Sequence, residues 1–396
     1  MSRVQNEREV VVVSGARTAI GDYGGALKEL AATKLGSIAI KEAVARAKVE
    51  PARVGHVVMG SVIHGEAKDM YLSRVAAIEA GIPVGTPCLT VNRLCGSGLQ
   101  SIVSASQHIL LGDCDVAVAG GAESMSRAAY FLPAGRWGQR MGDAAIVDAM
   151  TGALHDPFGH GHMGVTAENI AAKYGFTRDQ QDEFALSSHQ KAAKAMAAGY
   201  FKSQIVPIEL KTRKGVEQFT TDEHVRPAAT KDDLAKLKTV FKKDGTVTAG
   251  NASGINDAGA ALVLMEAKAA KNLKPIARLV AYAHAGVEPQ VMGLGPIPAV
   301  KRVFEKAGLK PADMDVVESN EAFAAQAMAV TKDLGLDPAK VNPNGGAVAL
   351  GHPIGATGSI LTVKALYELE RTQKRYALVT MCIGGGQGIA AIFERL

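Results

Sequence analysis

The chain has 396 residues, of which 47% are hydrophobic and 21% charged. These values are typical of a soluble globular protein of two or three domains and exclude a disordered chain. Four cysteines are too few for a disulfide-stapled miniprotein, and a net charge of +5 without a zinc-finger or RNA-recognition motif does not favour a nucleic-acid partner.

The first 120 residues predict strands that alternate with helices. Short apolar runs predict strands at 10–13, 56–59, 89–94 and 115–119. A helix is expected over 27–47, where apolar residues recur at helical spacing, and another from the glycine-rich segment 95–98 to about residue 111. This alternation indicates a layered α/β domain with a largely buried sheet.

The last third of the chain repeats this order. Strands are expected at 277–282, 314–318, 377–381 and 389–393, and helices at 299–307 and 359–369. The segments 115–121 and 377–385 match in pattern, and each follows a glycine-rich helix start. The sequence therefore predicts an internal duplication of two α/β halves, at a period too long for a solenoid.

Two apolar segments bear on localisation. Residues 376–393 carry no charge over 18 positions, so a membrane span must be considered, but glycines at the middle favour two short strands around a turn. Near the N-terminus the apolar run comprises only the four valines 10–13, which does not suit a signal peptide. We therefore expect a cytoplasmic protein without a membrane partner.

The region between the halves, about 123–248, has a different character. A capping-box pattern at 177–180 predicts a polar helix that ends near Gly199. Residues 202–243 hold ten Lys or Arg and six Asp or Glu, a net charge of +4. Such an insertion is either a solvated lid or a docking surface for a phosphorylated substrate, and the charge alone leaves both open.

Two cysteines are candidates for chemistry. Cys95 follows a predicted strand and opens a helix, where the helix dipole lowers the pKa of a thiol and favours the thiolate. Cys382 follows a strand at the edge of the sheet where α/β proteins place their ligands. The alternative for each is a buried, inert cysteine. Cys88 and Cys114 have no such setting, and we interpret them as structural.

His352 lies in the glycine-rich segment 342–358, where a histidine can serve as general base for a thiol. The alternative is a loop histidine bonded to the backbone. Neither this segment nor 384–388 is a nucleotide site, because the first lacks the P-loop Lys-Ser/Thr and the second lacks the Rossmann spacing and helix. Asn320 follows a predicted strand, and its simpler interpretation is a helix N-cap.

Three histidines, His155, His160 and His162, resemble metal ligands at first sight. No Cys, Asp or Glu pattern of known spacing completes the set, although Asp156 is adjacent. We therefore expect no metal site.

Taken together, the motifs resemble the thiolase family, in particular bacterial acetyl-CoA acetyltransferases and β-ketothiolases. They are NRLCGSG at 92–98, GGAESMS at 120–126, GNASGIND at 250–257, NEAF at 320–323, GHP at 351–353 and CIGGG at 382–386. The resemblance implies two duplicated α/β halves in a five-layered core, with an inserted loop domain that binds coenzyme A. The expected boundaries are 1–122 plus 249–270 for the N-terminal half, 123–248 for the loop domain and 271–396 for the C-terminal half.

The same resemblance implies an acyltransferase that condenses acetyl-CoA with an acyl-CoA, reversibly and by a ping-pong mechanism, to a 3-ketoacyl-CoA and CoA. Short acyl chains are expected, in fatty acid metabolism or in polyhydroxyalkanoate precursor supply. Coenzyme A is then a substrate and product, no cofactor is needed, and the family typically forms homotetramers.

The resemblance also assigns roles to residues. Cys95 would be the nucleophile, activated by His352, and Cys382 would remove a proton from the second acetyl-CoA. His352 and a water held by Asn320 would bind the enolate oxygen, and the backbone N–H groups of Cys95 and Gly384 the oxygen of the acylated thiol. Residues expected to line the CoA and pantetheine tunnel are Leu154, His162, Met163, Arg226, Phe241, Ala249, Ser253, Ala322 and Phe323.

Rival functions remain. Condensing enzymes of the same fold that use Cys with two histidines, or Cys, His and Glu, are disfavoured by Cys382 and Asn320. A Cys-His thioester hydrolase would need neither CoA nor Cys382. A silent acyl-CoA-binding protein would bind CoA esters without turnover.

Overall fold

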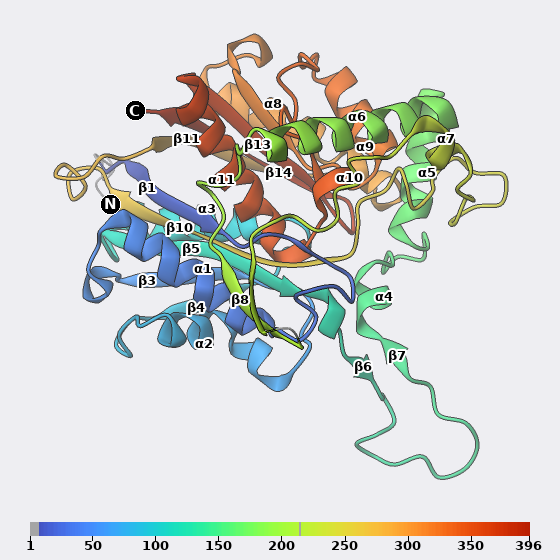
Figure 1. Ribbon diagram of the computed structural model, residues 1–396, viewed down its shortest axis with the longest axis horizontal. Coiled ribbons are helices and arrows are strands. Elements are labelled where there is room, and N and C mark those ends of the chain that lie inside the picture. Colours follow the sequence, from blue (N-terminus) through green and yellow to red (C-terminus); the bar gives the residue numbers. More distant parts are fainter. Residues whose placement is uncertain (1–7, 214) are drawn as a thin grey trace, which may run out of the picture.

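A single large sheet organises the computed structural model, which describes residues 8–213 and 215–396 (Figure 1). Its strand order is β12-β13-β14-β11-β1-β10-β5-β3-β4, and β2 (Gly21–Asp22) pairs with β10. The nine strands of this path are β1 (Val10–Arg17), β3 (His56–Gly60), β4 (Cys88–Val91), β5 (Val116–Ser124), β10 (Asn256–Glu266), β11 (Ala277–Gly286), β12 (Val316–Ser319), β13 (Tyr376–Ile383) and β14 (Gln387–Arg395).

The sheet consists of two halves with the same topology. They meet where β1 and β11 pair antiparallel over only two residue pairs, Val11–Arg278 and Val12–Ala277. Outward from this seam the orders β1-β10-β5-β3 and β11-β14-β13-β12 correspond. In both, the first two pairings are antiparallel and the third is parallel. The matching segments noted in the sequence become β5 and β13, so the predicted duplication is present in the fold.

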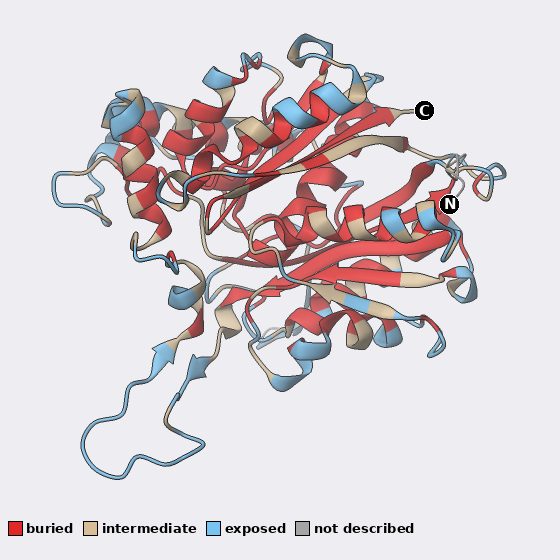
Figure 2. Ribbon diagram, turned by 180° about the vertical axis from the view of Figure 1, so that it is seen from behind, coloured by how far each residue is buried: buried red, intermediate tan, exposed pale blue. Residues whose placement is uncertain are grey.

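Helices cover both outer faces and fill the space between the halves (Figure 1). The first outer layer is α1 (Ala32–Ala47) and α2 (Leu72–Glu79), packed on the N-terminal half. The central layer is α3 (Ser97–Leu111) and α11 (Ile354–Thr372). The second outer layer is α8 (Pro296–Ala307) and α9 (Ala324–Asp333). Figure 2 shows burial concentrated in the strands and the central helices, as a five-layered arrangement requires.

The sequence patterns explain most of these elements. The valine run predicted at 10–13 is the start of β1, which is buried throughout and can therefore be apolar on both faces. The uncharged stretch 376–393 forms the hairpin of β13 and β14, as predicted. None of the helices in the part of the chain that the structure describes is long and apolar enough to cross a membrane.

Two local predictions need correction, and one strand was missed. The helix expected over 27–47 begins only at Ala32, because 27–31 form turns. The strand expected over 89–94 ends at Val91, and a tight turn follows. Strand β10 was not predicted, although it lies between β1 and β5 and is buried along its whole length. Its first half, NDAGAA, lacks the large β-branched residues that mark a strand.

The region between the halves contributes smaller elements. They are β6 (Tyr130–Phe131), β7 (Val147–Asp148), α4 (Ala149–Ala153), α5 (Met163–Tyr174), α6 (Arg178–Ala197), β8 (Ile208–Thr212), β9 (Gly215–Phe219) and α7 (Lys231–Ala235). Thr177 and Gln180 form the predicted capping box of α6. Helices α5 and α6 pack on α9 of the C-terminal half, and α6 also packs on α10 (Ala347–Leu350). Short 3₁₀ helices lie at Pro51–Arg53, Ala67–Tyr71, Met125–Arg127, Pro289–Leu294 and Pro311–Asp313.

Candidate active site

Cys95 stands on a strained turn between β4 and α3. Leu94, directly before it, has a φ of 44°, a left-handed conformation that costs a residue with a side chain roughly 1–2 kcal/mol. The turn closes where the Ser97 N–H donates to the Leu94 carbonyl at 2.9 Å. The cost is offset by this hydrogen bond and by packing, and the turn places the half-buried Cys95 thiol at the start of α3.

The surroundings of Cys95 raise the pKa of its thiol. Burial is the main cause, and the Glu123 carboxylate nearby adds to it. The backbone N–H groups of Gly384 and of Cys95 itself oppose this effect, since both lie against the sulfur and favour the thiolate. The expectation of a lowered pKa is therefore wrong for the free protein, because desolvation outweighs the helix start. Cys95 rests as a thiol.

Cys382 lies in β13 beside this turn. Its side chain is fully buried, and the pKa of its thiol is raised by burial and by the proximity of Cys95. Gly384, two residues further on, is the residue whose N–H reaches the Cys95 sulfur. The structure therefore brings the two candidate thiols together at one edge of the central layer.

The hydrogen bonds of His352 define its tautomer. Its Nδ1 lies 2.7 Å from the Thr357 hydroxyl oxygen, and that hydroxyl donates to the Pro353 carbonyl at 2.8 Å. The hydroxyl has only one hydrogen, so it must accept from Nδ1–H, which leaves Nε2 without a proton. Burial lowers the pKa of His352 to about 4, so the ring is neutral at pH 7. Nε2 thus carries no proton and can accept one.

Asn320 faces this nitrogen. Its Nδ2 donates to His352 Nε2 at 3.4 Å, and its own backbone N–H donates to the Thr380 carbonyl in β13 at 3.0 Å. Its Oδ1 is buried and has no hydrogen-bond partner among the described residues. The alternative interpretation as a helix N-cap is wrong, because α9 begins at Ala324 with Phe323 at the N-cap.

Glu321, next to Asn320, was not singled out from the sequence. Its buried carboxylate accepts from the Ser188 hydroxyl of α6 at 2.7 Å and from Asn342 Nδ2 at 2.8 Å. The first bond fastens the segment that carries Asn320 to the inserted region, and the second fastens it to the glycine-rich segment that leads to His352. An acidic residue after Asn320 was visible in the NEAF motif, but only the fold identifies its partners.

Most of the residues expected to line a tunnel form one cluster. Met163, Ala322 and Phe323 pack around Cys382, with Phe241 at their edge. The rings of His162 and Phe241 stack at 4.6 Å between centroids, and burial lowers the pKa of His162 to about 4.

The neighbouring residues extend this cluster. The Ser253 N–H donates to the Ala322 carbonyl at 3.0 Å, and the Leu154 carbonyl accepts from the Met163 N–H at 2.8 Å. Leu154 also packs in the apolar cluster that contacts Cys95. The sequence-predicted lining residues therefore continue from Cys382 to Cys95.

Arg226 and Ala249 lie in an adjoining pocket of about 710 Å³, together with His189 and His224. The Arg226 guanidinium pairs with Asp22 at 2.9 Å, and His224 Nδ1 lies 2.8 Å from the same carboxylate. The sequence did not point to His189, His224 or Asp22, because they come from separate segments. Together these residues form a pocket in the basic inserted region, and Arg226 lines it.

The three other histidine candidates do not form a metal centre. His155 stands edge-on to His162 at 5.2 Å between ring centroids. Within residues 8–213 and 215–396, no three His, Cys, Asp or Glu side chains gather as metal ligands would.

The comparison with protein families agrees with this geometry. The model of the thiolase N-terminal domain matches residues 10–268, and that of the thiolase C-terminal domain matches residues 273–395. This chain belongs to the thiolase family.

The similarity to known thiolases extends over nearly the whole chain. β-Ketothiolase BktB of Cupriavidus necator is 66% identical over 98% of this chain and 100% of its own length. The acetyl-CoA acetyltransferase of Allochromatium vinosum is 49% identical over 98% and 99%. The crystal structure of human mitochondrial 3-ketoacyl-CoA thiolase superposes with a TM-score of 0.97 at 46% identity, covering 98% and 99% of the two chains. The predicted fold class is thereby confirmed.

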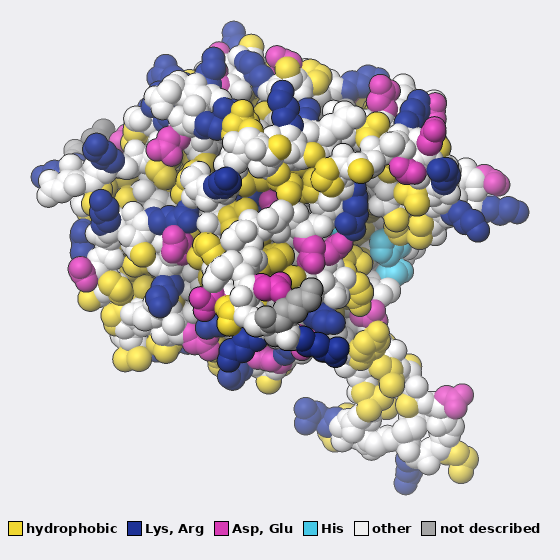
Figure 3. Space-filling model, in the orientation of Figure 1, with side chains coloured by type: hydrophobic (Ala, Val, Ile, Leu, Met, Phe, Trp, Pro, Cys, Tyr) yellow, Lys and Arg dark blue, Asp and Glu magenta, His cyan; other side chains and the backbone are white. Residues whose placement is uncertain are grey.

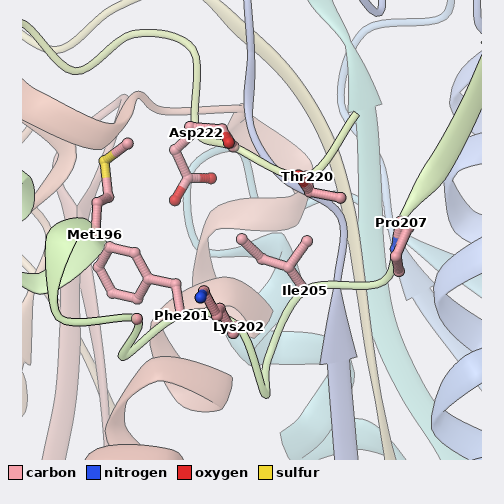
Figure 4. Close-up of a pocket in the computed structure, with 9 residues that line it drawn as sticks. Met196, Phe201, Lys202, Ile205, Pro207, Thr220 and Asp222 are labelled. Atoms are coloured by element: carbon pink, nitrogen blue, oxygen red, sulfur yellow. The ribbon is translucent and has the colours of Figure 1, made fainter. Parts of the chain in front are cut away.

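One further pocket of this thiolase shares none of these site residues. It measures about 410 Å³ and is lined by α6 and the segments after it, including Phe201, Lys202 and Asp222 (Figure 4). Asp222 forms a fully buried ion pair with Arg17 of β1 at 2.7 Å. This pair ties the inserted region to the N-terminal half.

Proposed function

We propose that this thiolase interconverts acetyl-CoA plus an acyl-CoA with a 3-ketoacyl-CoA plus CoA, through an acyl group carried on Cys95. The observation that carries the proposal is the arrangement around the Cys95 sulfur. Two backbone N–H groups point at it, a second thiol lies beside it, and an Asn320–His352 pair completes the site. The names of the relatives, a β-ketothiolase and acetyl-CoA acetyltransferases, support the same reaction.

In the first half-reaction, His352 Nε2 takes the proton of the Cys95 thiol as the sulfur attacks the thioester carbon. The neutral, proton-accepting Nε2 suits this role. The N–H groups of Cys95 and Gly384 hold the oxygen that becomes negative, a contribution of roughly 3–4 kcal/mol for each donor. The C–S bond to CoA breaks, and Cys382, which rests protonated, gives its proton to the departing CoA sulfur.

In the second half-reaction, the Cys382 thiolate removes a proton from the methyl group of acetyl-CoA. The enolate oxygen accepts from His352, which now carries a proton on Nε2, and from a water on the buried Oδ1 side of Asn320. The carbon attacks the acyl-Cys95 thioester, and the released Cys95 sulfur recovers its proton from His352. The Cys95 proton thus returns by way of His352, and the methyl proton replaces the one that Cys382 gave to CoA. The cycle uses only these side chains and CoA esters, without a cofactor.

The substrate enters along the residues already described. The adjoining pocket with Arg226 suits the phosphate end of CoA, and the apolar cluster with Met163 and Phe323 suits the pantetheine arm. The crystal structure of human mitochondrial 3-ketoacyl-CoA thiolase in complex with CoA, 46% identical with a TM-score of 0.96, supports CoA binding in this fold. Because bulky side chains pack close to Cys382, we expect short acyl chains.

The hairpin of β6 and β7 supports a homotetramer. It projects from the body, and Figure 3 shows hydrophobic side chains where it joins the body and again near its far end. Tyr130, Phe131, Trp137 and Met141 on it are between 57% and 91% exposed. Such an apolar surface is typical of a protein interface, and we assign it to contacts between copies of this chain. The four free cysteines further favour a reducing, cytoplasmic location.

The test is CoA-dependent cleavage of acetoacetyl-CoA, 3-ketopentanoyl-CoA and a long-chain 3-ketoacyl-CoA. We expect cleavage of the two short esters and none of the long one. Release of free acid without CoA would instead indicate a hydrolase. Tight binding of CoA esters without any cleavage would indicate a silent binding protein.

A further inference from the structure

Glu123, at the end of β5, is a buried carboxylate that the proposed mechanism does not use. Its Oε2 accepts from the backbone N–H of Gly355 at 2.8 Å and of Val62 at 3.1 Å, and its Oε1 accepts from the N–H of Ile63 at 3.1 Å. The side chain is fully buried, and no Lys or Arg among the described residues pairs with it. Burial raises the pKa of Glu123 to about 8, so the group is largely protonated at pH 7, and a buried acid of this kind persists only where its hydrogen bonds are needed.

The two segments that Glu123 holds both border the candidate active site. Ile63 follows β3, Ile354 opens α11, and both pack in the apolar cluster that contacts Cys95. His352 lies only three residues before Gly355. Glu123 is also close enough to Cys95 to raise the pKa of its thiol. The carboxylate therefore lies between the half of the fold that carries Cys95 and the helix that His352 precedes.

The first turn of α11 needs such a partner. Pro353, at the N-cap, provides no side-chain acceptor, and the Glu123 carboxylate instead receives a first-turn N–H. The first turn of α11 lies close to β3 and β5. A Cβ added at Gly60 would lie 2.8 Å from the Gly355 carbonyl oxygen, and a Cβ added at Gly121 would also clash with that oxygen. Gly60 at the end of β3 and Gly121 within β5 thus let α11 approach, and Glu123 fastens it there.

We propose that Glu123 is a positioning residue, which sets the place of His352 relative to Cys95 by tying the first turn of α11 to β5 and to the loop after β3. This inference rests on the proposed function, in which His352 accepts the Cys95 proton. Glu123 touches no reacting atom, and we expect its main effect to pass through the position of His352 rather than through its electrostatic effect on Cys95. A Gln of the same length turns an N–H₂ group toward at least one backbone N–H and cannot replace it.

A double-mutant cycle tests this inference with the full-length protein. Glu123→Gln, His352→Ala and the double variant are compared in thiolysis of acetoacetyl-CoA. We expect Glu123→Gln to lower kcat roughly 10–100-fold with KM for CoA within about twofold, as for other residues that orient a reacting group. In the His352→Ala background the same change should alter the residual rate by less than about twofold. Glu266→Gln, a buried acid at the far end of β10, is the matched control and should retain wild-type kcat.

Wild-type kcat in Glu123→Gln, or an equal loss in both backgrounds, would overturn the inference, because an independent structural defect does not depend on His352. If Glu123→Gln does not fold, Glu123→Asp keeps the carboxyl group but withdraws it from the Gly355 N–H, and the same two outcomes apply. Cys95→Ser separates this inference from the proposed function. If Cys95→Ser retains turnover, the proposed function fails whatever Glu123 does.

Discussion

Gly98 of α3 and Gly358 of α11 pack directly against each other. A Cβ added at Gly98 would lie 2.7 Å from the Ser359 nitrogen and 3.0 Å from the Gly358 nitrogen, and one at Gly358 would clash with the Leu99 nitrogen. Helix α3 begins just after Cys95, and α11 begins just after His352. Gly98 and Gly358 therefore let the two helices meet, and this approach brings the segments of Cys95 and His352 together.

Gly98→Ala should separate these helices. Overpacking a tight core contact costs roughly 1–3 kcal/mol, and we expect that loss in the free energy of unfolding together with a fall in kcat. Urea unfolding and thiolysis of acetoacetyl-CoA measure the two effects. Gly85→Ala is the matched control, because an added Cβ there meets nothing within 4 Å. A Gly98→Ala variant with wild-type kcat would show that the close approach is not needed for activity.

Thr357→Val tests the tautomer of His352. The variant keeps the shape of the side chain but removes the acceptor for Nδ1–H, so the ring can carry its proton on Nε2 instead. We predict that kcat falls roughly 10–100-fold, as for other partners that orient a catalytic histidine or ligand. Thr357→Ser retains the hydroxyl and should stay within about threefold of wild type. Equal rates for the Val and Ser variants would contradict the assignment of Nε2 as the proton acceptor.

Buried histidines make part of the stability dependent on pH. Burial lowers the pKa of His189 to about 4, whereas an unfolded histidine titrates near 6.5. The unfolded chain therefore binds the proton first, and the contribution of neutral His189 is complete above pH 6.5 and is lost as the pH falls toward 4. The loss is roughly 3 kcal/mol at most.

The measurement is the difference in free energy of unfolding between wild type and His189→Gln at pH 7.5, 6 and 5, by urea titration. We expect the advantage of wild type to shrink as the pH falls. The comparison with a variant is needed because the pKa values of Glu123 and Glu318 are raised in the folded protein. These two groups therefore make the free energy of unfolding of the wild type increase as the pH falls, opposite to His189. A difference that stays constant over this range would contradict a neutral, buried His189.

The sequence predicted the parts of this protein that depend on local pattern. The valine run of β1, the capping box of Thr177 and the glycine-rich starts of α3 and α11 are written in consecutive residues. The residues of the candidate site that belong to sequence motifs were predicted, and the structure brings Cys95, His352, Cys382 and Asn320 together. Their assigned roles stay predictions, as do the domain boundaries.

What could not be predicted depends on the three-dimensional packing. Strand β10 was missed because its small residues match no strand pattern. Small residues fit there because the strand is buried between β1 and β5. The pKa of Cys95 was predicted in the wrong direction, because desolvation depends on what covers the thiol. Glu123 and Glu321 acquire their partners only when distant segments meet.

The most direct test of the account asks where the acyl group resides. The Cys382→Ala variant is incubated with acetyl-CoA, digested, and analysed by mass spectrometry of the peptides. We predict that an acetyl group accumulates on Cys95 while no acetoacetyl-CoA forms. The nucleophile is intact and CoA can leave as a thiolate, so acylation is slower but still occurs, whereas the group that removes the methyl proton is missing. Acetoacetyl-CoA formed at the wild-type rate, or an acetyl group on another residue with Cys95 unmodified, would contradict the assignment of the two thiols.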